Sequence, residues 1–134
     1  MVAHGKGDFN KRILKLLRIQ TSISVSCQFC IDMNSFEYEE NGITQEEMYC
    51  LTGKYNINDV STFNIREKLV IGYAKMISQT PIKIPKELME KLKLNFTERE
   101  FVIMANTIAQ VNYWARLIQA LGVPPTGFSD KCDI

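Results

Sequence analysis

The chain has 134 residues, of which 46% are hydrophobic and 23% are charged, and its formal net charge is +1. This length is enough for one hydrophobic core, so we expect residues 1–134 to form a single domain. A nearly neutral chain gives no reason to expect a nucleic-acid partner. No apolar run approaches the ~20 residues of a membrane span, and residues 1–8 lack the apolar centre of a signal peptide. We therefore expect a cytoplasmic protein with no membrane partner.

A first helix is predicted over residues 8–23, where apolar side chains recur at helical spacing. Lys11, Lys15 and Arg18 share another face of this helix. We interpret Lys15 and Arg18 as a solvated stripe; the alternative is that these two cations face a thiol and favour its thiolate form. Residues 19–25 are rich in β-branched residues and serine, which predicts a frayed helix end or an extended segment.

A second helix is predicted over residues 26–40, with Ser26 as its N-cap and Asn41-Gly42 as its C-terminal stop. Further on, Thr44, Asn64 and Thr97 each stand three residues before a glutamate, as in a capping box. Pro85 favours the first turn of another helix. Residues 53–62 are polar and predict a loop. The expected helices in this half of the chain are 45–51, 65–79, 86–94 and 98–121.

The sequence thus predicts an all-α fold, a bundle of about six helices without a strand, with residues 1–7 and 126–134 as flexible tails. The last helix is apolar on more than one face, which indicates a central helix or one shared with a second subunit, so we expect a homo-oligomer. Four polar residues interrupt its apolar surface. Asn106 and Gln110 share one face of the helix, and Asn112 and Arg116 share another. We interpret all four as structural, and the alternative is that one of these two pairs lines a pocket near the cysteine pair.

Cys27 and Cys30 form a C-x-x-C motif at the expected start of a helix. Free N–H groups at a helix N-terminus favour a thiolate, so this pair suits redox chemistry. The alternatives are two small buried residues or half of a zinc site. A zinc site needs further ligands, but Cys50 and Cys132 stand alone and His4 is the only histidine. We therefore expect neither a metal nor a cofactor.

The residues that follow the pair offer few acids or bases. Asn34 is four residues after Cys30, on the same helix face, where it could bond to the sulfur or hold a water but could not act as a base. Glu37 is two turns away on that face, and Asp32 is expected to point to solvent. The alternative reading of Asn34 and Glu37 is ordinary polarity of a helix surface.

Several segments carry a resemblance to a known family. The first are residues 24–34 and residues 41–47, where the C-x-x-C is followed by Gly-Ile-Thr and acidic residues; residues 63–69, 96–100, 112–116 and 120–124 agree as well. Over about residues 8–125 the chain resembles the carboxymuconolactone decarboxylase / AhpD-like alkylhydroperoxidase family. The resemblance implies an AhpD-like helical fold that assembles as trimers or hexamers.

The same resemblance implies peroxidase or disulfide-reductase chemistry. Cys30 would attack a hydroperoxide or disulfide substrate, Cys27 would resolve the product to a disulfide, and an external dithiol would supply the electrons. Two family positions differ here. In the family's peroxidases a glutamate about a dozen residues before the first cysteine and a histidine four residues after the second form a proton relay. In this chain the first position falls near Lys15, and the second is occupied by Asn34. These losses imply poor activation of Cys30. The alternatives are a decarboxylase-type lyase, whose lactone-processing relatives do not depend on the pair, and a non-catalytic helical binding module.

Overall fold

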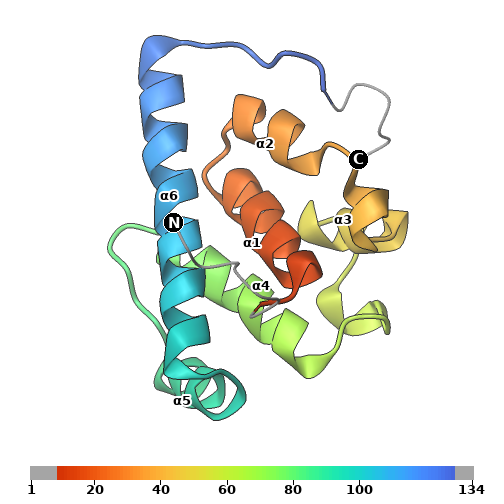
Figure 1. The fold of residues 1–134 in the computed structure, drawn as a ribbon, viewed down its shortest axis with the longest axis vertical. Coiled ribbons are helices and arrows are strands. Elements are labelled where there is room, and N and C mark those ends of the chain that lie inside the picture. The colour runs from red at the N-terminus through yellow and green to blue at the C-terminus, as the bar shows by residue number, and fades with distance from the viewer. Residues whose placement is uncertain (1–8, 129–134) are drawn as a thin grey trace.

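The computed structural model describes residues 9–128, and within them the fold is all-helical, with six α-helices and no strand (Figure 1). This confirms the predicted fold class. Among these residues no helix is both long enough and apolar enough to cross a membrane. The helices are α1 (Lys11–Ser24), α2 (Gln28–Ser35), α3 (Gln45–Leu51), α4 (Ile65–Ile77), α5 (Lys86–Asn95) and α6 (Glu98–Leu121). Short 3-10 turns occupy Tyr38–Asn41 and Ile57–Asp59.

Helix α1 is the central element, packed against α2, α4 and α6 (Figure 1). Asn10 begins it, because its side chain accepts a hydrogen bond from the backbone N–H of Arg12 at 2.8 Å. The helix continues to Ser24, so the predicted frayed or extended segment over 19–25 is wrong. Ile19, Thr21 and Ser22 are fully buried there, and tertiary packing overrides the modest helix propensity of β-branched residues and serine.

The hydrophobic core has two main parts that share α1. Leu17 packs with residues of α4, α5 and α6 in one part, and Leu16 packs with residues of α3 and α4 in the other. Both leucines are fully buried. Helix α6 is therefore not the central helix: Val102, Tyr113 and Leu121 on it remain exposed.

Arg12 joins the starts of two other helices to α1. Glu47 and Glu67 are the capping-box residues of α3 and α4, as predicted. Both carboxylates also bind the Arg12 guanidinium, which is 2.6 Å from Glu67 Oε2 through Nε and 2.9 Å from Glu47 Oε1 through Nη1. The two glutamate side chains are 1% and 5% exposed, so each carboxylate is satisfied by a helix start and a shared cation. The sequence pattern revealed the capping boxes but not the arginine between them.

Helix α2 differs most from prediction. It begins after Cys27 rather than at Ser26, and it ends at Ser35 rather than at Glu40. Ser26 and Glu37 both adopt the left-handed conformation, with φ of 53° and 56°. The turn at Glu37 allows Tyr38 to be buried in the core beside α1, and Glu37 therefore does not lie on the face of Cys30.

The C-terminal segment is fixed as far as the structure describes it. Asp32 Oδ2 accepts hydrogen bonds from the backbone N–H groups of Gly127 and Phe128, each at 3.0 Å, and the Phe128 ring packs against Phe36. Asp32 is buried, so the prediction that it points to solvent is wrong. Residues 126–128 of the predicted flexible tail make these contacts with Asp32. The remainder of that tail, residues 129–134 with Cys132, and the predicted N-terminal tail lie outside the described residues.

Candidate functional site

Cys27 and Cys30 form a disulfide at the N-terminus of α2, with their Cα atoms 5.2 Å apart. Cys27 is the N-cap of the helix, and its Sγ accepts a hydrogen bond from the backbone N–H of Cys30 at 3.2 Å. A helix N-terminus carries a partial positive charge. The local fold therefore favours negative charge on the Cys27 sulfur when the disulfide is opened.

A small apolar cluster between α2 and α6 surrounds the pair. Ala115 of α6 is its third buried member, and Phe29 and Ile118 pack against it. Gln119, one turn further along α6, donates from Nε2 to the backbone carbonyl of Ser26 at 2.9 Å. This bond holds the left-handed turn that leads into the cysteine motif. Helix α6 therefore determines where the disulfide lies.

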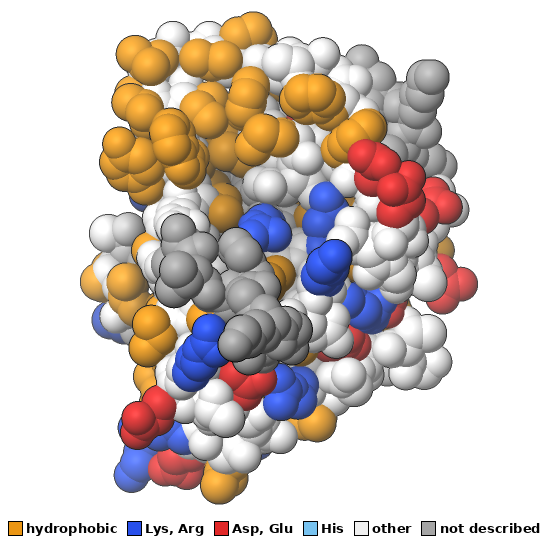
Figure 2. Space-filling view, in the orientation of Figure 1, with side chains coloured by type: hydrophobic (Ala, Val, Ile, Leu, Met, Phe, Trp, Pro, Cys, Tyr) orange, Lys and Arg blue, Asp and Glu red, His pale blue; other side chains and the backbone are white. Residues whose placement is uncertain are grey.

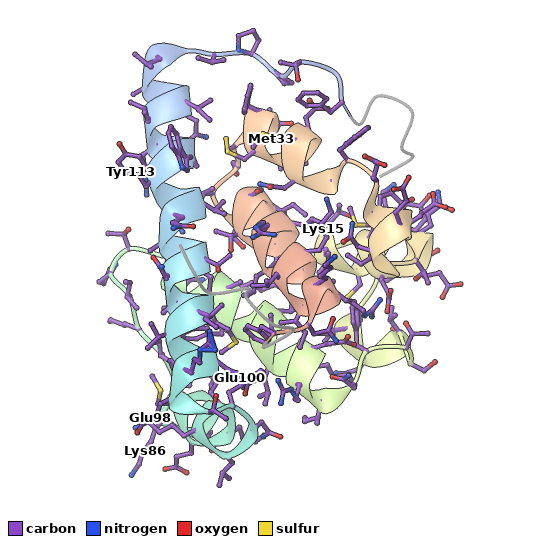
Figure 3. The ribbon with its side chains drawn as sticks, viewed as in Figure 1. Lys15, Met33, Lys86, Glu98, Glu100 and Tyr113 are labelled. Carbon is purple, nitrogen blue, oxygen red and sulfur yellow. A yellow bond between two sulfur atoms is a disulfide. The ribbon has the colours of Figure 1, made fainter. Side chains whose placement is uncertain are left out.

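A cavity of about 430 Å³ lies beside Cys30, between α1, α2 and α6. Both cysteines are buried, Cys27 at 0% and Cys30 at 2% exposure, but Cys30 lines the cavity and Cys27 does not. Met33, which projects from α2 towards α6, forms part of the wall, and Tyr113 lies on the opposite side of α6 (Figure 3). Cys30 is thus the sulfur that a molecule in the cavity would reach. The lining residues are Arg18, Phe29, Cys30, Met33, Asn34, Thr107, Gln110, Val111, Trp114 and Ile118.

Asn34 also lines this cavity, but its hydrogen-bond partner is not the sulfur. Its Nδ2 donates to Ser22 Oγ at 2.9 Å, and the buried Ser22 hydroxyl donates to the backbone carbonyl of Arg18 at 2.7 Å. This chain of hydrogen bonds joins α2 to α1. Asn34 therefore fixes the wall of the cavity and leaves Cys30 without a side-chain base at that position.

Lys11, Lys15 and Arg18, which share a face of α1, lie in three different environments. Lys11 is exposed, and Lys15 Nζ donates to the backbone carbonyl of Phe36 at 2.7 Å. Arg18 is half-buried and lines the cavity with Cys30, so the solvated-stripe interpretation is wrong for it. Burial lowers the pKa of the Arg18 guanidinium, and no described carboxylate lies within ion-pair distance of it.

The polar residues of α6 divide between the two interpretations. Asn112 donates to the backbone carbonyl of Ile108 at 3.0 Å and to Ser78 Oγ at 3.3 Å, which is a structural role. Gln110 instead lines the cavity of Cys30, as the alternative interpretation had it. Helical spacing places Gln110 and Asn112 on different faces of the helix, but it cannot say which face meets the cysteine pair.

Among the described lining residues of the cavity there is neither a carboxylate nor a histidine. Within residues 9–128 no three His, Cys, Asp or Glu side chains are grouped as metal ligands would be. Cys50 is buried, and burial raises the pKa of its thiol, so it is a poor nucleophile. The reactive chemistry of this site therefore centres on the disulfide.

Comparisons with known proteins agree with this description of the fold. No protein-family model matches the chain. An uncharacterized protein, YdfG of Bacillus subtilis (strain 168), is 28% identical over 118 residues, which cover 87% of this chain and 78% of that protein. The crystal structure of an Agrobacterium tumefaciens protein of unknown function, proposed to be an antioxidant defence protein AhpD, superposes with a TM-score of 0.78 at 19% identity, over 92% of this chain and 83% of that one. The chain therefore has the AhpD-like helical fold that its sequence predicts.

Proposed function

We propose that this protein is a thiol-dependent peroxidase or disulfide oxidoreductase that works through Cys27 and Cys30. The observation that supports this most is the disulfide at the start of α2, with one of its two sulfurs lining an apolar cavity. The AhpD-like fold is consistent with an antioxidant role. In this proposal Cys30 attacks, Cys27 resolves, and Asn34 positions the wall of the site.

The reaction begins with the reduced pair. The Cys30 thiolate attacks the outer oxygen of a hydroperoxide, the O–O bond breaks, and the alkoxide leaves as an alcohol after taking a proton. Cys30 is now a sulfenic acid. The Cys27 thiol attacks the Cys30 sulfur, water leaves, and the disulfide forms. An external dithiol then supplies two electrons and two protons to restore both thiols. A disulfide substrate would react with Cys30 by thiol–disulfide exchange instead.

The two sulfurs suit the two halves of this cycle. Cys30 is reachable from the cavity, so both the hydroperoxide and the external dithiol would meet it first. When the dithiol attacks Cys30, the leaving group is the Cys27 thiolate. The hydrogen bond from the Cys30 N–H and the helix N-terminus stabilise that thiolate, and a better leaving group speeds thiol–disulfide exchange.

Turnover is expected to be slow. None of the described cavity residues is a carboxylate or a histidine, so proton transfer to the leaving alkoxide falls to solvent. Arg18 is the charged side chain among the cavity residues that would favour the Cys30 thiolate.

Assembly as a homo-oligomer, a trimer or hexamer, in the cytoplasm belongs to the same proposal. Exposed apolar side chains on one side of α6, Trp114 and Leu117 among them, support it.

The test is consumption of cumene hydroperoxide with dithiothreitol as reductant, followed by the appearance of the alcohol. We expect catalytic formation of alcohol by the wild type and only the uncatalysed rate from the Cys27→Ser/Cys30→Ser double variant. A second assay offers a small disulfide in place of the hydroperoxide. A wild type no faster than the double variant with both substrates would refute the proposal in favour of the lyase or binding-module alternative.

A further inference from the structure

The charged residues that line the Cys30 cavity and the cavity next to it are all cations. Arg18 lines this cavity and also a second one of about 440 Å³, whose other lining residues include Lys11 and Lys15. No described lining residue of either cavity is acidic. Space-filling shows hydrophobic side chains gathered over α2 and the C-terminal half of α6, with Lys and Arg side chains beside them over α1 (Figure 2).

Arg18 differs from Arg12 and Arg66, because the structure places those two arginines in ion pairs. Arg12 and Arg66 each bind a described carboxylate, at distances of 2.6 Å and 2.9 Å. Arg18 has no such partner among residues 9–128, although burial has removed part of its hydration. A half-buried guanidinium without an anion is costly unless a ligand supplies the negative charge. Its planar fork matches the geometry of a carboxylate.

The remaining cavity wall is apolar. Phe29, Met33, Val111, Trp114 and Ile118 provide most of it, and the neutral polar residues among the lining are Asn34, Thr107 and Gln110. A volume of about 430 Å³ is in the range of small-molecule sites. Such a wall binds a peroxide with an apolar organic group better than a small, fully hydrated peroxide.

We propose that the natural substrate is an amphiphile, an organic hydroperoxide with an apolar body and a single carboxylate, and that Arg18 is the residue that selects the carboxylate. The apolar body lies along Met33, Val111 and Trp114, and the peroxide group reaches Cys30. A hydroperoxide of an unsaturated fatty acid has this chemistry. The peroxide part of this inference rests on the proposed function, whereas the carboxylate site does not.

Binding can be tested without turnover. Trp114 is the only tryptophan of the chain and lines the cavity, so its fluorescence reports occupancy. We expect the oxidised wild type to bind dodecanoate at least about tenfold more tightly than its methyl ester, since a hydrogen bond to a charged group is stronger than one to a neutral group. Arg18→Gln should remove that preference, Arg18→Lys should keep part of it, and Lys11→Gln should leave it unchanged. Equal binding of acid and ester by the wild type overturns the inference.

Turnover is tested with linoleic acid hydroperoxide and its methyl ester, which differ only in the charge of the head group. We expect kcat/KM to favour the acid. Arg18→Gln should abolish this preference, and because Arg18 also favours the Cys30 thiolate, the variant should reduce acid and ester with the same, lowered kcat/KM. Reduction of both by the wild type at equal rates would leave the proposed function standing and overturn the selection by Arg18. Reduction of neither, with dodecanoate binding that depends on Arg18, would refute the peroxidase and leave the carboxylate site standing.

Discussion

A Cys30→Ser variant is expected to consume no hydroperoxide when the reduced protein is mixed with substrate in the absence of an external dithiol. Cys27→Ser is expected to consume one equivalent and to stop with Cys30 as a sulfenic acid, which dimedone traps. The difference follows from access, because Cys30 lines the cavity and Cys27 does not. Mass spectrometry of the intact chain distinguishes a disulfide, a trapped sulfenic acid and an unreacted thiol.

Consumption of one equivalent by Cys30→Ser and none by Cys27→Ser would show that Cys27 is the attacking residue. It would mean that the stabilising hydrogen bond to Cys27 Sγ matters more than access from the cavity. Cys50→Ser is the matched control, since this cysteine is buried away from the site, and it is expected to behave as the wild type.

The largest loss of stability is expected from Arg12→Met. Glu47 and Glu67 would keep their buried positions without their shared cation, and removing one partner of such a cluster costs about 3–5 kcal/mol. Urea unfolding monitored by circular dichroism measures the free energy of unfolding. The control is Lys11→Met at the exposed neighbouring position, which should change it by less than about 0.5 kcal/mol. A similar small change for Arg12→Met would show that the cluster contributes little.

The loss of stability caused by Arg12→Met should be smaller in acid. Burial by itself raises the pKa of Glu47, but hydrogen bonds from Arg12, the Thr44 N–H and Thr62 outweigh it and hold the pKa below its ordinary value. A carboxylate with a lowered pKa in the folded state stabilises the protein fully above the ordinary glutamate pKa, and this contribution disappears as the pH falls through the lowered value. The wild type therefore loses stability towards acid, and the difference from Arg12→Met narrows. A difference that widens in acid would contradict this assignment.

Local signals in the sequence were sufficient for most of the fold. Thr44, Asn64 and Thr97 each begin a helix with the predicted capping box, and Gly122 ends α6 in the left-handed conformation. These features depend on residues three or four positions apart, so the sequence displays them directly. The cysteine pair was found for the same reason.

The sequence could not reveal contacts between distant segments. The end of α2 depends on burial of Tyr38 beside α1, and Asp32 is buried because it accepts hydrogen bonds from a segment 95 and 96 residues away. Arg18 looks like a surface cation in a helical stripe until α2 and α6 are placed beside it. Charge and spacing cannot distinguish a solvated arginine from one that lines a cavity.

Peptide mapping of the reduced wild type after one equivalent of cumene hydroperoxide, with no other reductant or oxidant present, decides whether Cys27 and Cys30 are the redox pair. We expect the peroxide to be converted to its alcohol, Cys27 and Cys30 to be joined in one disulfide, and Cys50 to keep its free thiol. Unchanged peroxide, or oxidation that leaves Cys27 and Cys30 as thiols, would contradict this expectation.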